Sequence, residues 1–198
     1  MKLHYSPTSP YVRKVVACAI ACGLDGRITR VATNPHASPP ELLADNPLSR
    51  VPCLVTDDGL ALFDSPVICE YLDAIGEGGL FPPAGPLRWR ALKLQAVGDG
   101  IMDAAVMRRM EQGRPEEAAR TTHMERQAAA VTRSLDLLAK DVPADHLDIG
   151  TITVACALGY LDLRFAHEDW RTSRPALAAW FAAMGKRPEI AETAPPPA

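Results

Sequence analysis

The stretch that decides the fold runs from Asn46 to Leu72 and reads NPLSRVPCLVTDDGLALFDSPVICEYL. Two short apolar runs, Cys53–Thr56 and Leu60–Phe63, enclose the sequence Asp-Asp-Gly, which is typical of a tight hairpin turn. Pro52 stands directly before the first run, where a proline ends a loop without removing a hydrogen bond from the sheet. The stretch therefore predicts a loop, a β-hairpin and then a helix.

Two helices of the N-terminal half are predicted to begin with the same dipeptide. Ser65-Pro66 follows the hairpin, and Ser9-Pro10 follows a strand expected at residues 2–5. A serine side chain caps free backbone N–H groups, and proline fits the first helical position because it has no N–H. Helix N-termini also attract negative charge, so both entrances are candidate sites for an anionic ligand group. Taken alone, each serine is more simply a helix cap.

The remaining N-terminal sequence extends this pattern outward from the hairpin. Apolar residues at helical spacing predict a helix from Pro10 to about Gly23, and residues 28–32 predict a second strand. A short helix is expected near Pro40–Ala44. The resulting order, β-α-β-α-β-β-α, describes a mixed sheet with helices on its faces.

The second half of the chain is predicted to be all-helical. Residues 77–86 are rich in glycine and proline and predict a linker between a domain at 1–76 and a second domain at 87–198. Beyond the linker we expect five helices. Three span 87–112, Pro115–Lys140 and Ile149–Phe165, and two shorter ones begin at Pro175 and Pro188. An extended tail is expected at Pro195–Pro197. The helix at 149–165 is apolar almost all round, which predicts a buried central helix with Asp148 as its N-cap.

These features resemble the glutathione S-transferases. Val51-Pro52 before a hairpin and Asp64-Ser65 at a helix start resemble the glutathione-binding domain, and the helical second half extends the resemblance to the whole chain. The segments SPTSPYVRKV, DGIMDA and CALGYLDLR are similar to a bacterial subgroup of glutathione S-transferase-like proteins. The resemblance implies an α/β domain of thioredoxin-like fold followed by a C-terminal helical bundle.

The resemblance also implies how the tripeptide is held. In the family the bond before the hairpin proline is cis, here Val51–Pro52, and the backbone of the residue before it pairs with the cysteinyl part of glutathione. The acidic residue and the serine at the helix start, here Asp64 and Ser65, hold the γ-glutamyl end. Without the resemblance, Asp64 is a solvated turn residue.

Other expected contacts come from two loops and from the helix at 87–112. His36 and Arg50 fall in the loops where the family binds the glycine carboxylate, although isolated residues of these types are more often surface residues. The second substrate is expected against Met102, Val106 and Arg109. Methionines at such positions are more often core residues. Asp99 and Asp103 are usually solvated charges, with Asp99 as a weaker candidate for contacting glutathione across a dimer interface.

The resemblance implies that a hydroxyl at the first strand–helix junction stabilises the thiolate of glutathione. Ser9 fits best, Thr8 is the second choice and Tyr5 the third. A free thiol has a pKa of about 8.5, and lowering it by two units needs about 2.7 kcal/mol. A hydrogen bond to a charged acceptor supplies roughly 1.5–3 kcal/mol and a helix N-terminus roughly 0.3–1 kcal/mol. Ser9 can therefore activate the thiol without being a nucleophile.

Composition restricts the remaining possibilities. Five cysteines with no CxxC pair predict reduced core residues in a reducing cytoplasm, and the scattered histidines predict no metal site. The net charge of −3 gives no reason to expect nucleic acid or an anionic membrane as a partner. No apolar run has the roughly 18 residues needed to span a bilayer.

The resemblance thus implies a homodimeric glutathione transferase of the detoxification type, and the cysteine pattern favours a cytoplasmic location. Glutathione serves as a co-substrate that is conjugated to a small electrophile. One alternative is a glutathione-dependent reductase or peroxidase, against which the lack of a cysteine near Ser9 argues. The other is a binding or scaffold protein that keeps the pocket without turnover. The sequence does not separate this last possibility from an enzyme, because Ser9 remains a helix cap in either case.

Overall fold

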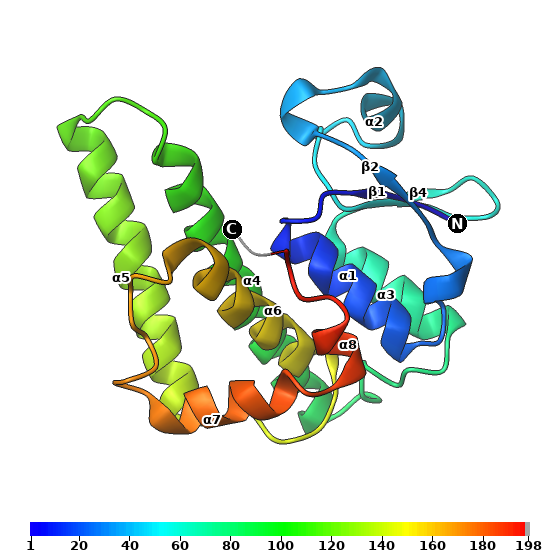
Figure 1. Cartoon of the computed structure of the whole chain (residues 1–198). Helices are drawn as coiled ribbons and strands as arrows, with labels where there is room; N and C mark the ends of the chain where they lie inside the picture. The colour runs from blue at the N-terminus through cyan, green and yellow to red at the C-terminus, as the bar shows by residue number, and fades with distance from the viewer. Residues whose placement is uncertain (197–198) are drawn as a thin grey trace.

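The computed structural model describes residues 1–196, so Pro197 of the predicted tail lies outside the described residues. Its N-terminal half contains a four-stranded mixed sheet (Figure 1). The strands are β1 (Lys2–Tyr5), β2 (Thr29–Ala32), β3 (Cys53–Val55) and β4 (Ala61–Leu62), in the order β2-β1-β3-β4. The β1 strand runs parallel to β2 and antiparallel to β3, and β3 and β4 form the antiparallel hairpin. The predicted hairpin is confirmed.

Helices cover both sides of this sheet. The α1 helix (Pro10–Ala21) and the α3 helix (Ser65–Ile75) pack together on one side, and α2 (Pro40–Asp45) lies on the other (Figure 1). Val12 and Val15 on α1 are buried because the apolar residues of this helix recur at helical spacing and face the sheet. The observed element order matches the predicted one.

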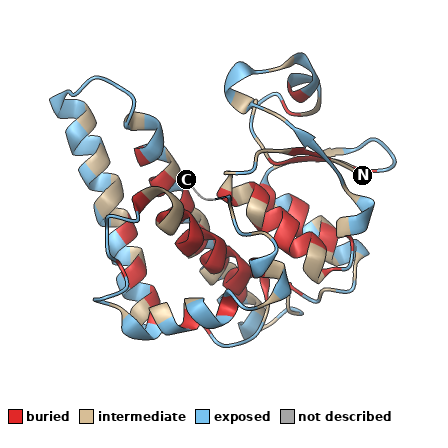
Figure 2. Cartoon of the chain, viewed as in Figure 1, coloured by how far each residue is buried: buried red, intermediate tan, exposed pale blue. Residues whose placement is uncertain are grey.

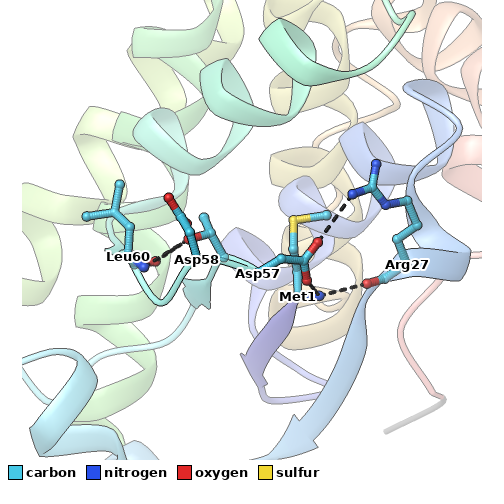
Figure 3. Close-up of polar contacts among 6 residues, drawn as sticks. Met1, Arg27, Asp57, Asp58 and Leu60 are labelled. Carbon is cyan, nitrogen blue, oxygen red and sulfur yellow. Dashed lines mark hydrogen bonds and ion pairs between the residues drawn. The ribbon is translucent and has the colours of Figure 1, made fainter.

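The hairpin turn is tied to the start of the chain (Figure 3). The Asp57 carboxylate accepts a hydrogen bond from the Met1 ammonium group at 2.6 Å and another from Arg27 Nη2 at 3.2 Å. The Met1 ammonium also donates to the Arg27 carbonyl oxygen at 3.0 Å. These positive groups hold the pKa of Asp57 below its usual range. The contacts fix the turn against the beginnings of β1 and β2.

The segment between the two halves, residues 76–85, is bound to both of them. The Asp73 carboxylate on α3 accepts hydrogen bonds from the backbone N–H groups of Leu80 at 2.7 Å and Phe81 at 3.0 Å. The Leu80 side chain is fully buried, and its carbonyl oxygen accepts from the N–H of Ile149 at 3.0 Å. The segment is therefore glycine-rich in sequence and firmly anchored in structure.

The second half consists of helices, as predicted. They are α4 (Pro86–Glu111), α5 (Ala118–Lys140), α6 (Ile149–Phe165), α7 (Pro175–Met184) and α8 (Pro188–Ala191). The prediction that the second of these begins at Pro115 is wrong, because α5 begins at Ala118. Neither Gly113 nor Arg114 has a side-chain oxygen that could cap a helix starting at Pro115. Within residues 1–196 we find no helix long and apolar enough to cross a membrane.

The α6 helix is the buried centre of this half (Figure 2). Its N-cap is Asp148, whose Oδ1 accepts from the Thr151 N–H at 2.8 Å, while the Asp148 N–H donates to Thr151 Oγ1 at 2.9 Å. This capping box confirms the predicted start. Gly150 lets α4 approach closely, because a Cβ atom there would lie 2.5 Å from the Ala91 carbonyl oxygen. The tight α4–α6 contact gives α1 a rigid surface to pack against.

Candidate functional site

Ser9 lies where β1 passes into α1. It is the N-cap residue, and its Oγ accepts a hydrogen bond from the Val12 N–H at 3.3 Å. Pro10 occupies the first helical position, and the Ser9 carbonyl oxygen accepts from the Arg13 N–H at 3.0 Å. The predicted capping role is confirmed. The Ser9 side chain is half-buried, so its hydroxyl stays within reach of a ligand.

The loop before β3 is held by a buried asparagine that the sequence interpretation did not single out. Asn46 is 1% exposed, and its Nδ2 donates to the Arg50 carbonyl oxygen at 2.9 Å. The same side chain accepts from the Leu48 N–H at 3.0 Å. The Val51–Pro52 peptide bond at the end of this loop is cis, and Val51 is half-buried.

The entrance of α3 differs from the predicted one. The prediction that Ser65 caps this helix is wrong: Asp64 is the N-cap residue, and Ser65 is the first helical residue, with Pro66 after it. Proline fits here equally well, since the N–H groups of the whole first turn lack helical partners. Ser65 is 2% exposed, Asp64 is exposed, and no side-chain hydrogen bond caps the helix.

The loops that contain His36 and Arg50 are joined to each other. Ser49 Oγ donates to the Pro35 carbonyl oxygen at 3.0 Å and lies 2.9 Å from Ser38 Oγ. Both His36 and Arg50 are exposed. The structure therefore presents these two side chains from loops that are hydrogen-bonded to each other.

Two contacts join α1 to α4 close to Ser9. Lys14 is fully buried, and its Nζ lies 2.6 Å from Asp99 Oδ1. The Tyr11 hydroxyl donates to Asp103. Asp99 is therefore not the solvated charge expected, because it is half-buried and pairs with Lys14, whereas Asp103 is exposed as expected and also accepts from Tyr11. Neither partner was predictable from local sequence, since α1 and α4 are far apart along the chain.

Burial governs the protonation of these groups. Desolvation raises the pKa of Asp99, an effect that the Lys14 charge opposes and that the charges of Asp103 and Asp64 reinforce. Burial, together with the hydrogen bond to Asp103, raises the pKa of Tyr11, so its hydroxyl stays protonated and acts as a donor. The part of α4 that contains Asp99 and Asp103 is therefore acidic, and it faces the start of α1 and the entrance of α3.

The residues expected to meet the second substrate have three different environments. Met102 is fully buried in the hydrophobic core and has no surface to offer a ligand. Val106 is partly buried, and Arg109 is exposed. Of these three residues, Val106 and Arg109 therefore remain available for contact with a bound molecule.

A small pocket opens beside Ser9, between the two halves of the chain. Its walls come from the β1–α1 loop, α1, α6 and the C-terminal segment. The residues that matter for its chemistry are Thr8, Ser9, Arg13, Tyr160, Leu163 and Pro195. Its volume of about 10 Å³ is close to that of a single water molecule, so the pocket by itself does not enclose an organic ligand.

Comparison with known proteins places this arrangement in a family. Residues 8–75 match the family profile "Glutathione S-transferase, N-terminal domain", and residues 118–183 match "Glutathione S-transferase, C-terminal domain". The Escherichia coli K12 protein named "Uncharacterized GST-like protein YibF" is 35% identical over 204 residues, covering 100% of both chains. The chain belongs to the glutathione S-transferase family.

Solved structures of other family members agree with this fold. A glutathione transferase family member from Pseudomonas fluorescens Pf-5, with bound glutathione, has a TM-score of 0.93 and 41% identity over 98% of each chain. A second structure of a glutathione transferase family member from Pseudomonas fluorescens Pf-5, with bound S-(propanoic acid)-glutathione, has a TM-score of 0.89 and 40% identity. The match covers 99% of this chain and 100% of that chain. A Methylobacillus flagellatus KT glutathione S-transferase with glutathione bound has a TM-score of 0.87 and 36% identity over 98% and 99% of the chains. The predicted fold class is confirmed.

The cysteines of this glutathione S-transferase family member are core residues, as predicted. All five are free and buried. Cys156 lines the pocket beside Ser9. Burial raises the thiol pKa of Cys156, Cys22 and Cys53 to about 11 in each case. A thiol with a raised pKa is a poor nucleophile at neutral pH. No group of three or more His, Cys, Asp or Glu side chains suited to a metal ion occurs within residues 1–196.

Proposed function

We propose that the chain is a glutathione transferase that conjugates glutathione, its co-substrate, to a small electrophile. The observation that carries this proposal is the state of the Ser9 hydroxyl. Its oxygen accepts from the Val12 N–H, and no acceptor for its proton is seen among the described residues. The hydroxyl can therefore donate to a thiolate without giving up the helix cap. Thr8 lines the same pocket and is the second choice.

The energy required of this hydroxyl is modest. Lowering the thiol pKa from about 8.5 to about 6.5 requires roughly 2.7 kcal/mol of preference for the anion. A charge-assisted hydrogen bond from Ser9 supplies roughly 1.5–3 kcal/mol, and the N-terminus of α1 adds roughly 0.3–1 kcal/mol. The two terms together match the requirement, so no further activating group is needed.

The reaction itself is a transfer to carbon. The thiol proton leaves to solvent, and the sulfur donates an electron pair to the electrophilic carbon, forming a C–S bond. In a substitution the leaving group departs with its bonding pair; in an addition the neighbouring carbon takes up a proton. Ser9 stabilises the charge on sulfur before attack and forms no covalent bond to the substrate.

The rest of the tripeptide extends from this point toward the sheet edge. We place the cysteinyl backbone against Val51 and the γ-glutamyl end at the entrance of α3. The uncapped N–H groups of that helix suit the γ-glutamyl carboxylate, with Ser65 in the first turn, and the exposed Asp64 suits the amine. His36 and Arg50, on their linked loops, are assigned to the glycine carboxylate. The surface between Ser9 and the α4 residues Val106 and Arg109 is assigned to the electrophile.

The exposed face of α4 supports the proposal of a homodimer. Trp89 is 69% exposed, and Lys93, Ala96, Gly100 and Met107 continue the same stripe along the helix. Glycine inside a helix costs roughly 0.5–1 kcal/mol relative to alanine. A Cβ atom at Gly100 would meet nothing within 4 Å in the chain itself, so intramolecular packing does not require a glycine there. The close approach of a second copy would account for a glycine at this position.

Light scattering after size exclusion tests this interface. We expect the wild type at twice the chain mass and Gly100→Leu at the monomer mass, because the larger side chain blocks the approach. Ala129→Leu, at an exposed position of α5, is the matched control and should remain a dimer. A wild type that is monomeric at all concentrations tested would exclude the homodimer. We also propose a cytoplasmic location, which the five free cysteines support.

The decisive experiment for the transferase proposal is a titration of the bound glutathione thiol. Thiolate absorbance in the far ultraviolet is followed against pH for the wild type, Ser9→Ala and Thr8→Val. We expect a bound pKa about two units below that of free glutathione in the wild type and Thr8→Val, and a value near 8.5 in Ser9→Ala. If Thr8→Val restores the pKa and Ser9→Ala does not, the activating hydroxyl is Thr8.

A bound thiol whose pKa equals that of free glutathione would reject the transferase mechanism and favour a protein that binds glutathione without turnover. A panel of electrophiles and peroxides then separates a transferase from a reductase or peroxidase. The structure supports the transferase, because the cysteine nearest the pocket, Cys156, is buried and its thiol pKa is raised.

A further inference from the structure

Two serines of the N-terminal half have a left-handed backbone conformation. Ser38 has a φ of 44° and Ser49 a φ of 51°, and they are the only non-glycine residues with positive φ among residues 1–196. A side chain in this region crowds its own backbone, a conflict that glycine avoids. Strained residues of this kind persist only where the surrounding structure holds them in place. The two serines therefore call for a physical reason.

Their hydroxyl groups join two loops. Ser49 Oγ donates to the Pro35 carbonyl oxygen at 3.0 Å and lies 2.9 Å from Ser38 Oγ. Each hydroxyl has one proton, so Ser38 Oγ must be the donor to Ser49 Oγ. The Pro35 carbonyl oxygen also accepts from the Ser38 N–H at 3.2 Å. The two hydroxyls and the carbonyl thus form a continuous chain of hydrogen bonds between the loops.

This linkage lies directly beside the two residues assigned to the glycine carboxylate. His36 stands between Pro35 and Ser38, inside the turn that the linkage closes, and Arg50 follows Ser49 in the chain. A change in the spacing of the two loops would therefore move His36 and Arg50 relative to each other.

The backbones of His36 and Arg50 are also fixed, while their side chains are free. The His36 N–H donates to Asn34 Oδ1 at 3.1 Å, and the Arg50 carbonyl oxygen accepts from Asn46 Nδ2 at 2.9 Å. Both side chains are exposed, and neither forms an ion pair with another residue of the described chain, 1–196. Two cationic or polar ends on anchored backbones suit the capture of one anionic group.

We propose that Ser49 is a positioning residue, which sets the spacing of His36 and Arg50 so that both bind the glycine carboxylate of glutathione. This inference rests on the proposed function and adds the residue that makes the protein select for that carboxylate. Loops that move independently must be ordered when the ligand binds, which lowers affinity, whereas loops already joined need not be. The role explains a strained serine at this position, because glycine has no hydroxyl to make the link.

The test compares glutathione with γ-glutamyl-cysteinyl-glycinamide by calorimetry. The two ligands have the same size, and a neutral carboxamide replaces the glycine carboxylate in the second. We expect the wild type to bind glutathione about tenfold more tightly, as is typical of a carboxylate held by charge-assisted hydrogen bonds. Ser49→Gly and Ser49→Ala should each reduce this preference to about threefold or less, while affinity for the glycinamide changes less than about twofold.

The same two variants separate positioning from stability. Both lack the hydroxyl, but only the alanine variant keeps the strain of the left-handed backbone. We therefore expect Ser49→Ala to unfold at a lower urea concentration than Ser49→Gly, although both lose the preference to the same extent. A preference kept in Ser49→Gly and lost in Ser49→Ala would follow stability instead of the hydroxyl, and would overturn the inference.

A second comparison asks whether Ser49 acts through the two side chains. His36→Gln combined with Arg50→Gln should remove the preference for the carboxylate. Adding Ser49→Gly to this pair should then leave glutathione affinity unchanged to within about twofold, because no side chain remains for Ser49 to position. A further loss of glutathione affinity would show an independent contribution of Ser49 and contradict its positioning role.

Ser173→Gly is the matched control. Ser173 is an exposed loop serine of the helical half, and its Oγ accepts from Arg174 Nη1 at 2.9 Å, so the variant also loses one hydroxyl contact. It should keep the full preference. Equal affinities of the wild type for the two ligands, with a lowered thiol pKa in bound glutathione, would reject this inference and leave the transferase proposal intact. Absence of glutathione binding would reject both.

Discussion

The entrances of α1 and α3 have the same Ser-Pro dipeptide and different structures. At α1 the serine is the N-cap, its oxygen bonds the Val12 N–H, and its side chain is half-buried. At α3 the dipeptide is shifted by one position into the helix, so Ser65 is buried and the N-cap, Asp64, makes no capping bond. One entrance therefore presents a hydroxyl, and the other presents free N–H groups beside a carboxylate.

The difference shows how one local motif serves two parts of a ligand. A capped helix end has a hydroxyl whose proton remains available, which suits a thiolate. An uncapped end keeps its backbone donors for a carboxylate. The entrance of α6 is a third case, in which Asp148 and Thr151 cap each other and His146 Nε2 lies 2.8 Å from the second Asp148 carboxylate oxygen, so both carboxylate oxygens are already engaged. Substitutions at the three entrances should therefore have separable effects on stability and binding.

The largest expected effect is on stability at the α6 entrance. Asp148→Ala removes a buried cap, and we expect the free energy of unfolding to fall by about 2 kcal/mol, at the upper end for N-caps. Urea denaturation measures it, and Asp145→Ala, at an exposed position nearby, is the control. The thiol pKa of bound glutathione should not change. A shift in that pKa would mean that α6 and the Ser9 site are coupled.

The next effect is on binding at the α3 entrance. Ser65→Ala should weaken glutathione affinity about five- to tenfold, the effect of one lost hydrogen bond to a charged group. Stability should change by less than about 0.5 kcal/mol, because the hydroxyl caps nothing. Calorimetry and urea denaturation measure the two quantities. Lost stability with unchanged affinity would make Ser65 a structural residue only.

The smallest effect is on stability at the α1 entrance. Ser9→Ala should lower the free energy of unfolding by about 0.5–1 kcal/mol in the absence of glutathione, since the capping bond of 3.3 Å is long. Ser9→Gly should cost only about a few tenths of a kcal/mol, because glycine is also accepted at an N-cap. Both variants should lose thiol activation equally. Unequal loss would show that the cap, rather than the hydroxyl, controls the thiol.

The sequence by itself determined the element order, the hairpin and most helix bounds. These depend on local chemistry: the Asp-Asp-Gly turn, proline at helix starts, and the reciprocal Asp148–Thr151 pattern. It also indicated the polar residues around the β1–α1 and α3 entrances, because Ser9, Asp64 and Ser65 lie at signals that act over three or four residues. Where such a signal was weak, as at Pro115, the predicted helix start was wrong by three residues.

Only the tertiary structure decided which groups meet. Nothing near Lys14 in sequence reveals that it is buried against Asp99, and nothing near Met102 distinguishes it from the available Arg109. The close packing of α4 against α6 likewise depends on the small residue Gly150. Side-chain surroundings arise from elements that are distant in the chain, whereas turns and caps are completed by neighbouring residues. For that reason the fold followed from the sequence, and the burial of Lys14 against Asp99 and of Met102 in the core did not.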